Sequence, residues 1–98
     1  MRNCFIDHRS RSIADLCDYY DRGMIITRIN VPEASRGQGN GSALLKKICA
    51  AADAEGVTLF LEIAPSGPLN FKALQEWYGR YGFKPWLGMY RRQPKETK

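Results

Sequence analysis

The sequence predicts a single α/β domain of the α+β type, with a mixed central sheet flanked by helices. Two apolar, β-branched segments are each followed by a segment with apolar residues at helical spacing, and two short aromatic segments close the chain. In chain order we expect strands at residues 24–31 and 57–63, each followed by a helix, at 42–54 and 70–81, and a terminal hairpin at 83–86 and 89–92. A strand, a glycine-rich turn and a helix form the centre of this plan.

Length and cysteine content set limits on the class of protein. The 98 residues predict one domain, 1–98, in which residues 93–98 form a disordered tail. No apolar run approaches the roughly 20 residues that span a membrane, and the N-terminus lacks the apolar segment of a secretory signal. The three cysteines, Cys4, Cys17 and Cys49, are an odd number without a close pair, so we expect neither a disulfide framework nor a metal site. These features predict a reduced, cytoplasmic protein with no membrane contact.

The formal net charge of +5 is consistent with two classes of anionic partner. One is a nucleic acid, and the other is a polyanionic cofactor. The basic residues are scattered, and four of the fifteen lie at the end of the chain: Arg91, Arg92, Lys95 and Lys98. This distribution does not favour nucleic acid, although net charge alone does not separate the two classes.

The predicted helix at 42–54 has an apolar stripe and a polar side. The stripe consists of Leu44, Leu45, Ile48, Cys49 and Ala52. Lys46, Lys47 and Asp53 are expected to face away from the core. Gly56 is expected to end the helix in a left-handed conformation.

A glycine-rich turn joins the first strand to this helix: Arg36-Gly37-Gln38-Gly39-Asn40-Gly41. A helix start leaves about four backbone N–H groups without partners and carries the positive end of the helix dipole. Glycines let a ligand approach the backbone, so the turn predicts an anion site, most often for a phosphate. It is not a P-loop, because Ser42 and Ala43 follow the last glycine, and it does not match the G-x-G-x-x-G dinucleotide fingerprint.

The turn does match R-x-x-G-x-G, with Arg36, Gly39 and Gly41. This pattern resembles the acetyl-coenzyme A (acetyl-CoA) pyrophosphate loop of the GNAT superfamily of N-acetyltransferases. The preceding V-P-E, residues 31–33, is similar to the family as well.

A second motif supports the resemblance. The stretch LQEWYGRYGFKPW, residues 74–86, is similar to the superfamily's C-terminal signature, with Tyr78 at the tyrosine position and Gly82 and Phe83 at the Gly-Phe position. The two motifs have the family's order and separation. The resemblance covers roughly residues 24–92 and implies a truncated GNAT fold.

The chain departs from the family pattern in three places. Only 23 residues precede the strand at 24–31, so most of the region that helps form the acceptor groove is expected to be missing. In this the chain resembles miniature members from phage genomes, some of which modify a host defence protein. Gly23 occupies the position at which some members carry a Glu base, and Asn40 replaces an aliphatic residue.

Residues 13–20 allow two interpretations. Helical spacing relates four of their side chains, Ile13, Leu16, Cys17 and Tyr20, and Ser12 is a suitable N-cap. The superfamily, in contrast, usually has a strand here, paired as a hairpin with the next one. The local pattern favours a helix. Before it, residues 4–8 are expected to form a short strand.

The resemblance implies residues for donor binding and for catalysis. The expected acetyl-CoA-binding residues are Ile29, Asn30, Val31, Arg36, Gly37, Gln38, Gly39, Asn40, Gly41, Ser42 and Asn70. Tyr78 is the candidate general acid for the leaving thiolate, and Glu62, a carboxylate in an apolar strand, is the candidate base. The alternatives are a packed core aromatic for Tyr78 and a strand-end residue that reaches solvent for Glu62.

The implied function is transfer of an acetyl group from acetyl-CoA to a primary amine, in first place an amine of a protein, by direct attack in a ternary complex. The alternative is a catalytically inactive GNAT-fold module that binds coenzyme A or a partner protein, such as a phage anti-defence protein. A homodimer is a further option, because aromatic residues suited to an interface are available, namely Trp77, Trp86 and Tyr90.

Overall fold

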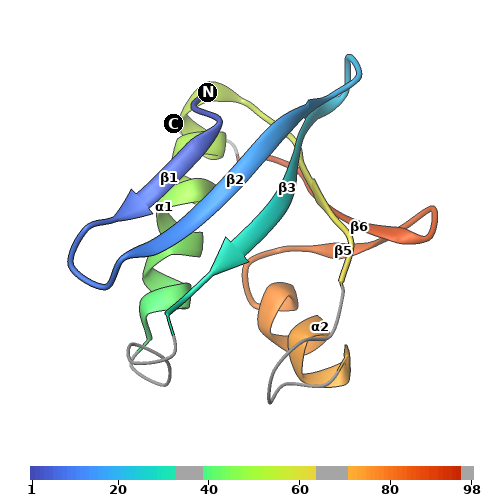
Figure 1. Ribbon diagram of the computed structural model, residues 1–98. Coiled ribbons are helices and arrows are strands. Elements are labelled where there is room, and N and C mark those ends of the chain that lie inside the picture. Colours follow the sequence, from blue (N-terminus) through green and yellow to red (C-terminus); the bar gives the residue numbers. More distant parts are fainter. Residues whose placement is uncertain (33–38, 64–70, 96–98) are drawn as a thin grey trace.

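A computed structural model describes residues 1–32, 39–63 and 71–95. Its elements are β1 (Cys4–Asp7), β2 (Ser12–Tyr19), β3 (Gly23–Asn30), α1 (Asn40–Glu55), β4 (Leu59–Leu61), α2 (Phe71–Gly79), β5 (Lys84–Trp86) and β6 (Met89–Arg92). The strands form one mixed sheet in the order β1-β2-β3-β4-β6-β5, and α1 lies across one of its faces (Figure 1). The predicted fold class is confirmed.

The core lies between α1 and the sheet. Strands β1, β2 and β3 form an antiparallel meander, and β4 then pairs with β3 in parallel because α1 carries the chain back across the sheet. The predicted apolar stripe of α1 is buried in one cluster with strand residues such as Leu16 and Leu59. Gly56 ends α1 at a φ of 67°, in the left-handed conformation expected for it.

Segment 13–20 is a strand, so the predicted helix is wrong. Backbone pairing with both β1 and β3 gives this segment hydrogen bonds on both edges. Its buried side chains alternate as in a strand, at Ser12, Ala14 and Leu16. The apparent helical spacing spans a β-bulge between Asp15 and Leu16 and extends into the turn at Tyr20. Pairing with two neighbouring strands outweighs this local pattern. The other predicted elements are confirmed to within two residues, except that β4 is shorter.

Asp53 does not face away from the core, which corrects a second prediction. Arg92 on β6 donates to both carboxylate oxygens of Asp53, at 2.8 and 2.9 Å, and to the carbonyl oxygen of Tyr81 at 2.6 Å. The backbone N–H of Lys95 also donates to Asp53, at 2.8 Å. The end of β6 and the residues after it are therefore attached to α1. Residues 96–98 lie outside the described chain.

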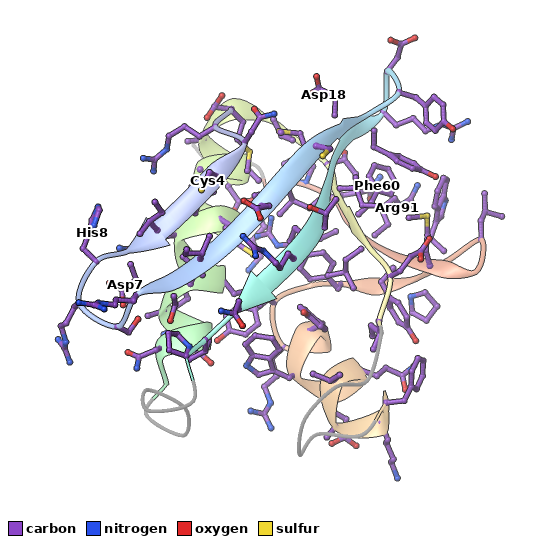
Figure 2. All side chains as sticks on the ribbon, viewed as in Figure 1. Cys4, Asp7, His8, Asp18, Phe60 and Arg91 are labelled. Carbon is purple, nitrogen blue, oxygen red and sulfur yellow. The ribbon has the colours of Figure 1, made fainter. Side chains whose placement is uncertain are left out.

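The sheet face opposite α1 carries a row of packed aromatic rings. The ring of Phe60 lies 4.7 Å from that of Tyr19 and 5.3 Å from that of Trp86, centroid to centroid. Phe60 and Arg91 are paired where β4 meets β6, and both are labelled in Figure 2. Neither helix of the described chain has the length and apolar character of a membrane span.

Candidate functional site

The first turn of α1 has the features of an anion site. Gly39 precedes the helix at a φ of 76°, and α1 begins at Asn40 with no acidic side chain in its first turn. The N–H groups of such a turn point along the helix axis without intrahelical partners. The predicted residues Gly39, Asn40, Gly41 and Ser42 therefore lie together at this helix start. Arg36, Gly37 and Gln38 lie outside the described residues.

Three elements meet at Gly41. A Cβ atom added to Gly41 would lie 3.4 Å from Cγ2 of Val31, which follows β3, and 3.6 Å from Cζ2 of Trp77 on α2. The indole Nε1 of Trp77 donates a hydrogen bond to Oγ of Ser42, at 3.0 Å. Because indole N–H is only a donor, the Ser42 hydroxyl accepts this bond and keeps its own proton to donate elsewhere.

Trp77 was not among the predicted site residues. Trp77 is partly buried: its ring packs against the core cluster, and its N–H is bonded to Ser42. Tyr90 is only 9% exposed and belongs to the same core. The sequence has only one local signal for this contact. A buried indole N–H needs a hydrogen-bond partner, but the sequence does not identify that partner.

Strands β3 and β4 separate after a short parallel pairing. They pair over three positions, from Met24 with Leu59 to Ile26 with Leu61. β3 then continues to Asn30 along β2 alone, and the described chain provides no strand on its other edge beyond Ile26. This edge includes the predicted residues Ile29 and Asn30, and its backbone groups can pair with an extended ligand as an added strand would.

Tyr78 occupies the inner side of α2. Its ring lies 4.8 Å from that of Trp77 and 5.7 Å, edge-on, from that of Phe83. Burial raises the pKa of the Tyr78 phenol, so the group stays protonated at neutral pH. Within the described ranges the hydroxyl has no hydrogen-bond partner. Asn70, just before α2, is outside the described residues.

Glu62 lies at a different place, just beyond the end of β4. Its side chain is exposed and lines an open cavity of about 480 Å³, together with Phe71, Trp86 and Tyr90. Tyr78 is not part of this lining. The structure therefore does not bring the candidate base and the candidate acid into one cavity: Glu62 is reached from the cavity, whereas Tyr78 is packed on α2.

Gly23 explains why a base is absent at the start of β3. An added Cβ would lie 2.0 Å from the carbonyl oxygen of Thr58, and the φ of Gly23 is +153°. The backbone before β4 thus occupies the space that a side chain would need. A carboxylate at this position is incompatible with the way β3 and β4 pair.

The replacement Gly23→Ala is expected to lower the free energy of unfolding by about 1–3 kcal/mol, because the strand end must shift to relieve the contact with Thr58. Gly79→Ala is the matched control: in α2 an added Cβ meets no atom within 4 Å, so stability should be unchanged or slightly higher. Urea unfolding measures both. Equal stabilities of the two variants would contradict the close contact.

The acetyltransferase (GNAT) domain family model matches residues 4–85, which is most of the chain. The chain belongs to the GNAT acetyltransferase family. A comparison with curated proteins finds no matching sequence.

Among solved structures, the GNAT fold of this chain is similar to the anti-CRISPR protein AcrVA5. The TM-score is 0.72, and the identity is 18% over 92% of this chain and 98% of that one. It is also similar to a GNAT family acetyltransferase from Staphylococcus aureus Mu50, with a TM-score of 0.65 and 18% identity. There the match covers 92% of this chain and 65% of the other.

Proposed function

We propose that this chain is an acetyl-CoA-dependent N-acetyltransferase that acetylates a primary amine of a protein. One observation carries the proposal. The start of α1, the end of β3 and helix α2, which contains Tyr78, come together around Gly41. Family membership supports the donor, because GNAT domains generally use acetyl-CoA. The free cysteines of the described chain fit a reducing compartment such as the cytoplasm.

The residues at the junction suit a donor with a pyrophosphate and an extended amide arm. Backbone N–H groups of Gly39 to Ser42 would bind the pyrophosphate, and the Ser42 hydroxyl has a proton to add. The free edge of β3 at Ile29 and Asn30 would hydrogen-bond the pantetheine amides, followed by Val31. A backbone N–H of this edge would stabilise the oxyanion that forms on the thioester. Arg36, Gly37, Gln38 and Asn70 belong to the same proposal.

Glu62 and Tyr78 have complementary roles in the transfer. A lysine amine has an ordinary pKa of about 10.4, so it must lose a proton before it attacks. Because Glu62 does not share a cavity with Tyr78, Glu62 would accept that proton through ordered water as the new N–C bond forms. When the C–S bond breaks, Tyr78 gives its phenolic proton to the leaving thiolate. The raised pKa of Tyr78 keeps that proton available.

A non-catalytic module is the second candidate. The likeness to AcrVA5, an anti-CRISPR protein of which this chain covers 98%, is compatible with it. At 18% identity that likeness concerns the fold. In this alternative the same scaffold binds a host defence protein, with or without coenzyme A, and transfers nothing.

The test mixes purified protein with acetyl-CoA and lysine-containing proteins, and follows the release of free thiol and the mass of the acceptors. The proposal expects acetylated acceptor and free coenzyme A in equal amounts. It also expects a higher melting temperature with acetyl-CoA, since a ligand at about 100 times its dissociation constant stabilises by roughly 2.7 kcal/mol. A shift in melting without product would favour the non-catalytic module, and no shift and no product would reject the acetyl-CoA site.

A further inference from the structure

Two hairpin turns hold large apolar side chains in an unfavourable conformation. Tyr20, in the turn between β2 and β3, has a φ of 52° and is 82% exposed. Leu87, between β5 and β6, has a φ of 47° and is 83% exposed. Left-handed backbone costs a bulky residue roughly 1–2 kcal/mol. Side chains this exposed bury little apolar surface in return, and within the fold the Tyr20 ring contacts that of Tyr19 edge-on, at 5.0 Å. The fold itself therefore does not explain their presence.

The conformation is most unfavourable in the turn at Leu87. Trp86 and Met89 are paired, so Leu87 and Gly88 form a two-residue hairpin loop, with φ values of 47° and 80°. Turns with two positive φ values favour Asn-Gly or Asp-Gly, because a short polar side chain tolerates the left-handed region at the first position. Leucine is a poor choice for this turn. Its exposed side chain is better explained by a contact with another molecule.

The two turns flank one open cavity of about 660 Å³, lined by Tyr19, Tyr20, Arg22, Trp86, Leu87 and Met89 together with Asp21. We call it the hairpin groove. Its floor is well packed: Tyr19 and Trp86 both contact the ring of the buried Phe60, and the Tyr19 hydroxyl donates to Sδ of Met89 at 3.5 Å. Rigid aromatic side chains of this kind are enriched where proteins bind other proteins.

The charge at the groove is mainly positive. The guanidinium carbons of Arg22 and Arg91 lie 5.6 and 5.0 Å from the centre of the Trp86 ring. Neither guanidinium forms an ion pair with any described residue. Among the described residues that line the groove, Asp21 has the one carboxylate. Acidic side chains of a partner would therefore be attracted to this rim.

The hairpin groove adjoins the Glu62 cavity at the β5–β6 turn, because Trp86, Leu87 and Met89 line both of them. A ligand that passes over this turn can contact the two together. We propose that the two adjoining cavities dock the acceptor as an extended polypeptide segment, with a lysine at Glu62 and neighbouring apolar and acidic residues in the hairpin groove. The placement of the lysine at Glu62 rests on the proposed acetyltransferase function. The contacts in the hairpin groove do not depend on it. A small free amine would reach only Glu62.

The test compares three amines as acetyl acceptors. The first is a short peptide with a central lysine flanked by leucine, phenylalanine and glutamate; the second has the same lysine flanked by serine and lysine; the third is Nα-acetyl-lysine amide. The proposal expects kcat/KM for the first peptide to exceed that of the other two by about tenfold or more. Equal values for all three would overturn it.

Tyr20→Asn separates docking from folding. Asparagine suits the left-handed turn, so the melting temperature should stay the same or rise, whereas kcat/KM for the first peptide should fall about tenfold. The value for Nα-acetyl-lysine amide should not change, because Tyr20 does not line the Glu62 cavity.

Leu87→Asn should lower kcat/KM for the first peptide without loss of stability. Arg11→Asn is the matched control, at a left-handed residue (φ 61°) in the β1–β2 turn, and should have no effect on any acceptor. A Tyr20→Asn variant with wild-type peptide kinetics would refute the docking surface.

Binding measurements separate this inference from the proposed function. If no amine is acetylated, fluorescence anisotropy with the labelled first peptide still tests the groove. Binding that weakens about tenfold in Tyr20→Asn and not in Arg11→Asn would support docking without transfer. No binding by the wild-type protein would overturn it. Sedimentation velocity tests the other occupant: a dimer that dissociates in Tyr20→Asn would assign the groove to a second copy of this chain, against the proposal.

Discussion

Replacing Tyr78 by phenylalanine is expected to lower kcat for acetyl transfer by about 100-fold, because a general acid contributes roughly 10²–10⁴ to the rate. The variant loses only the hydroxyl, which has no hydrogen-bond partner within the described residues. The ring contacts with Trp77 and Phe83 are retained. Acetyl-CoA binding and the melting temperature should therefore stay close to those of the wild type, as measured by calorimetry and thermal unfolding.

The pH profile checks the role independently. A general acid works only in its protonated form, and burial raises the pKa of Tyr78, so its proton remains in place up to alkaline pH. The wild-type rate should fall once the phenol ionises, and Tyr78→Phe should lack this fall. Tyr81→Phe is the matched control, since Tyr81 also packs beside Trp77, and its rate should be unchanged. If Tyr78→Phe turns over at the wild-type rate, Tyr78 is not the general acid and only packs as an aromatic ring.

Replacing Arg92 by methionine is expected to lower the free energy of unfolding by about 3–5 kcal/mol, the usual cost of removing one partner of a buried ion pair. The Arg92 side chain is 4% exposed and that of Asp53 is 17% exposed. Methionine keeps an apolar stem but leaves the Asp53 carboxylate and the Tyr81 carbonyl without their donors. Urea unfolding measures the loss.

Two further variants define what the pair contributes. Adding Asp53→Asn to Arg92→Met should recover part of the loss, because no uncompensated charge is left. Arg28→Met removes a pair with Asp15 in which both side chains are exposed, at 58% and 39%, and should cost less than about 1 kcal/mol. A cost at Arg92 no larger than that at Arg28 would contradict the structural role of the buried pair.

Acid should diminish the contribution of this pair. Hydrogen bonds from Arg92 hold the pKa of the Asp53 carboxyl below its usual range. A lowered folded-state pKa stabilises the fold above the unfolded value of about 3.9, and this stabilisation is lost as pH falls through the lower folded value. The stability difference between wild type and Arg92→Met should therefore be full at neutral pH and shrink below about pH 4. A constant difference down to the acid limit of the folded state would contradict this assignment.

Local patterns in the sequence were sufficient to predict the elements that meet at the proposed donor site. The order of strand and helix, the buried stripe of α1 and the left-handed Gly56 depend on residues close together in the chain, and the described part of the chain has all of them. Two motifs at the family's separation were sufficient for the family, which the domain match confirms.

Contacts between distant residues decided the rest. Segment 13–20 is a strand because β1 and β3 pair with it on both sides, and a single-segment pattern contains no information about those neighbours. Asp53 and Arg92 are 39 residues apart, and Ser42 and Trp77 are 35 apart. The separation of Glu62 from Tyr78 likewise depends on how β4, α2 and the last hairpin pack. The sequence by itself determined the local elements, because backbone preference and apolar periodicity act over a few residues. Only the tertiary structure decided which side chains share a site and which hairpin tips flank it, because those contacts form when distant segments pack together.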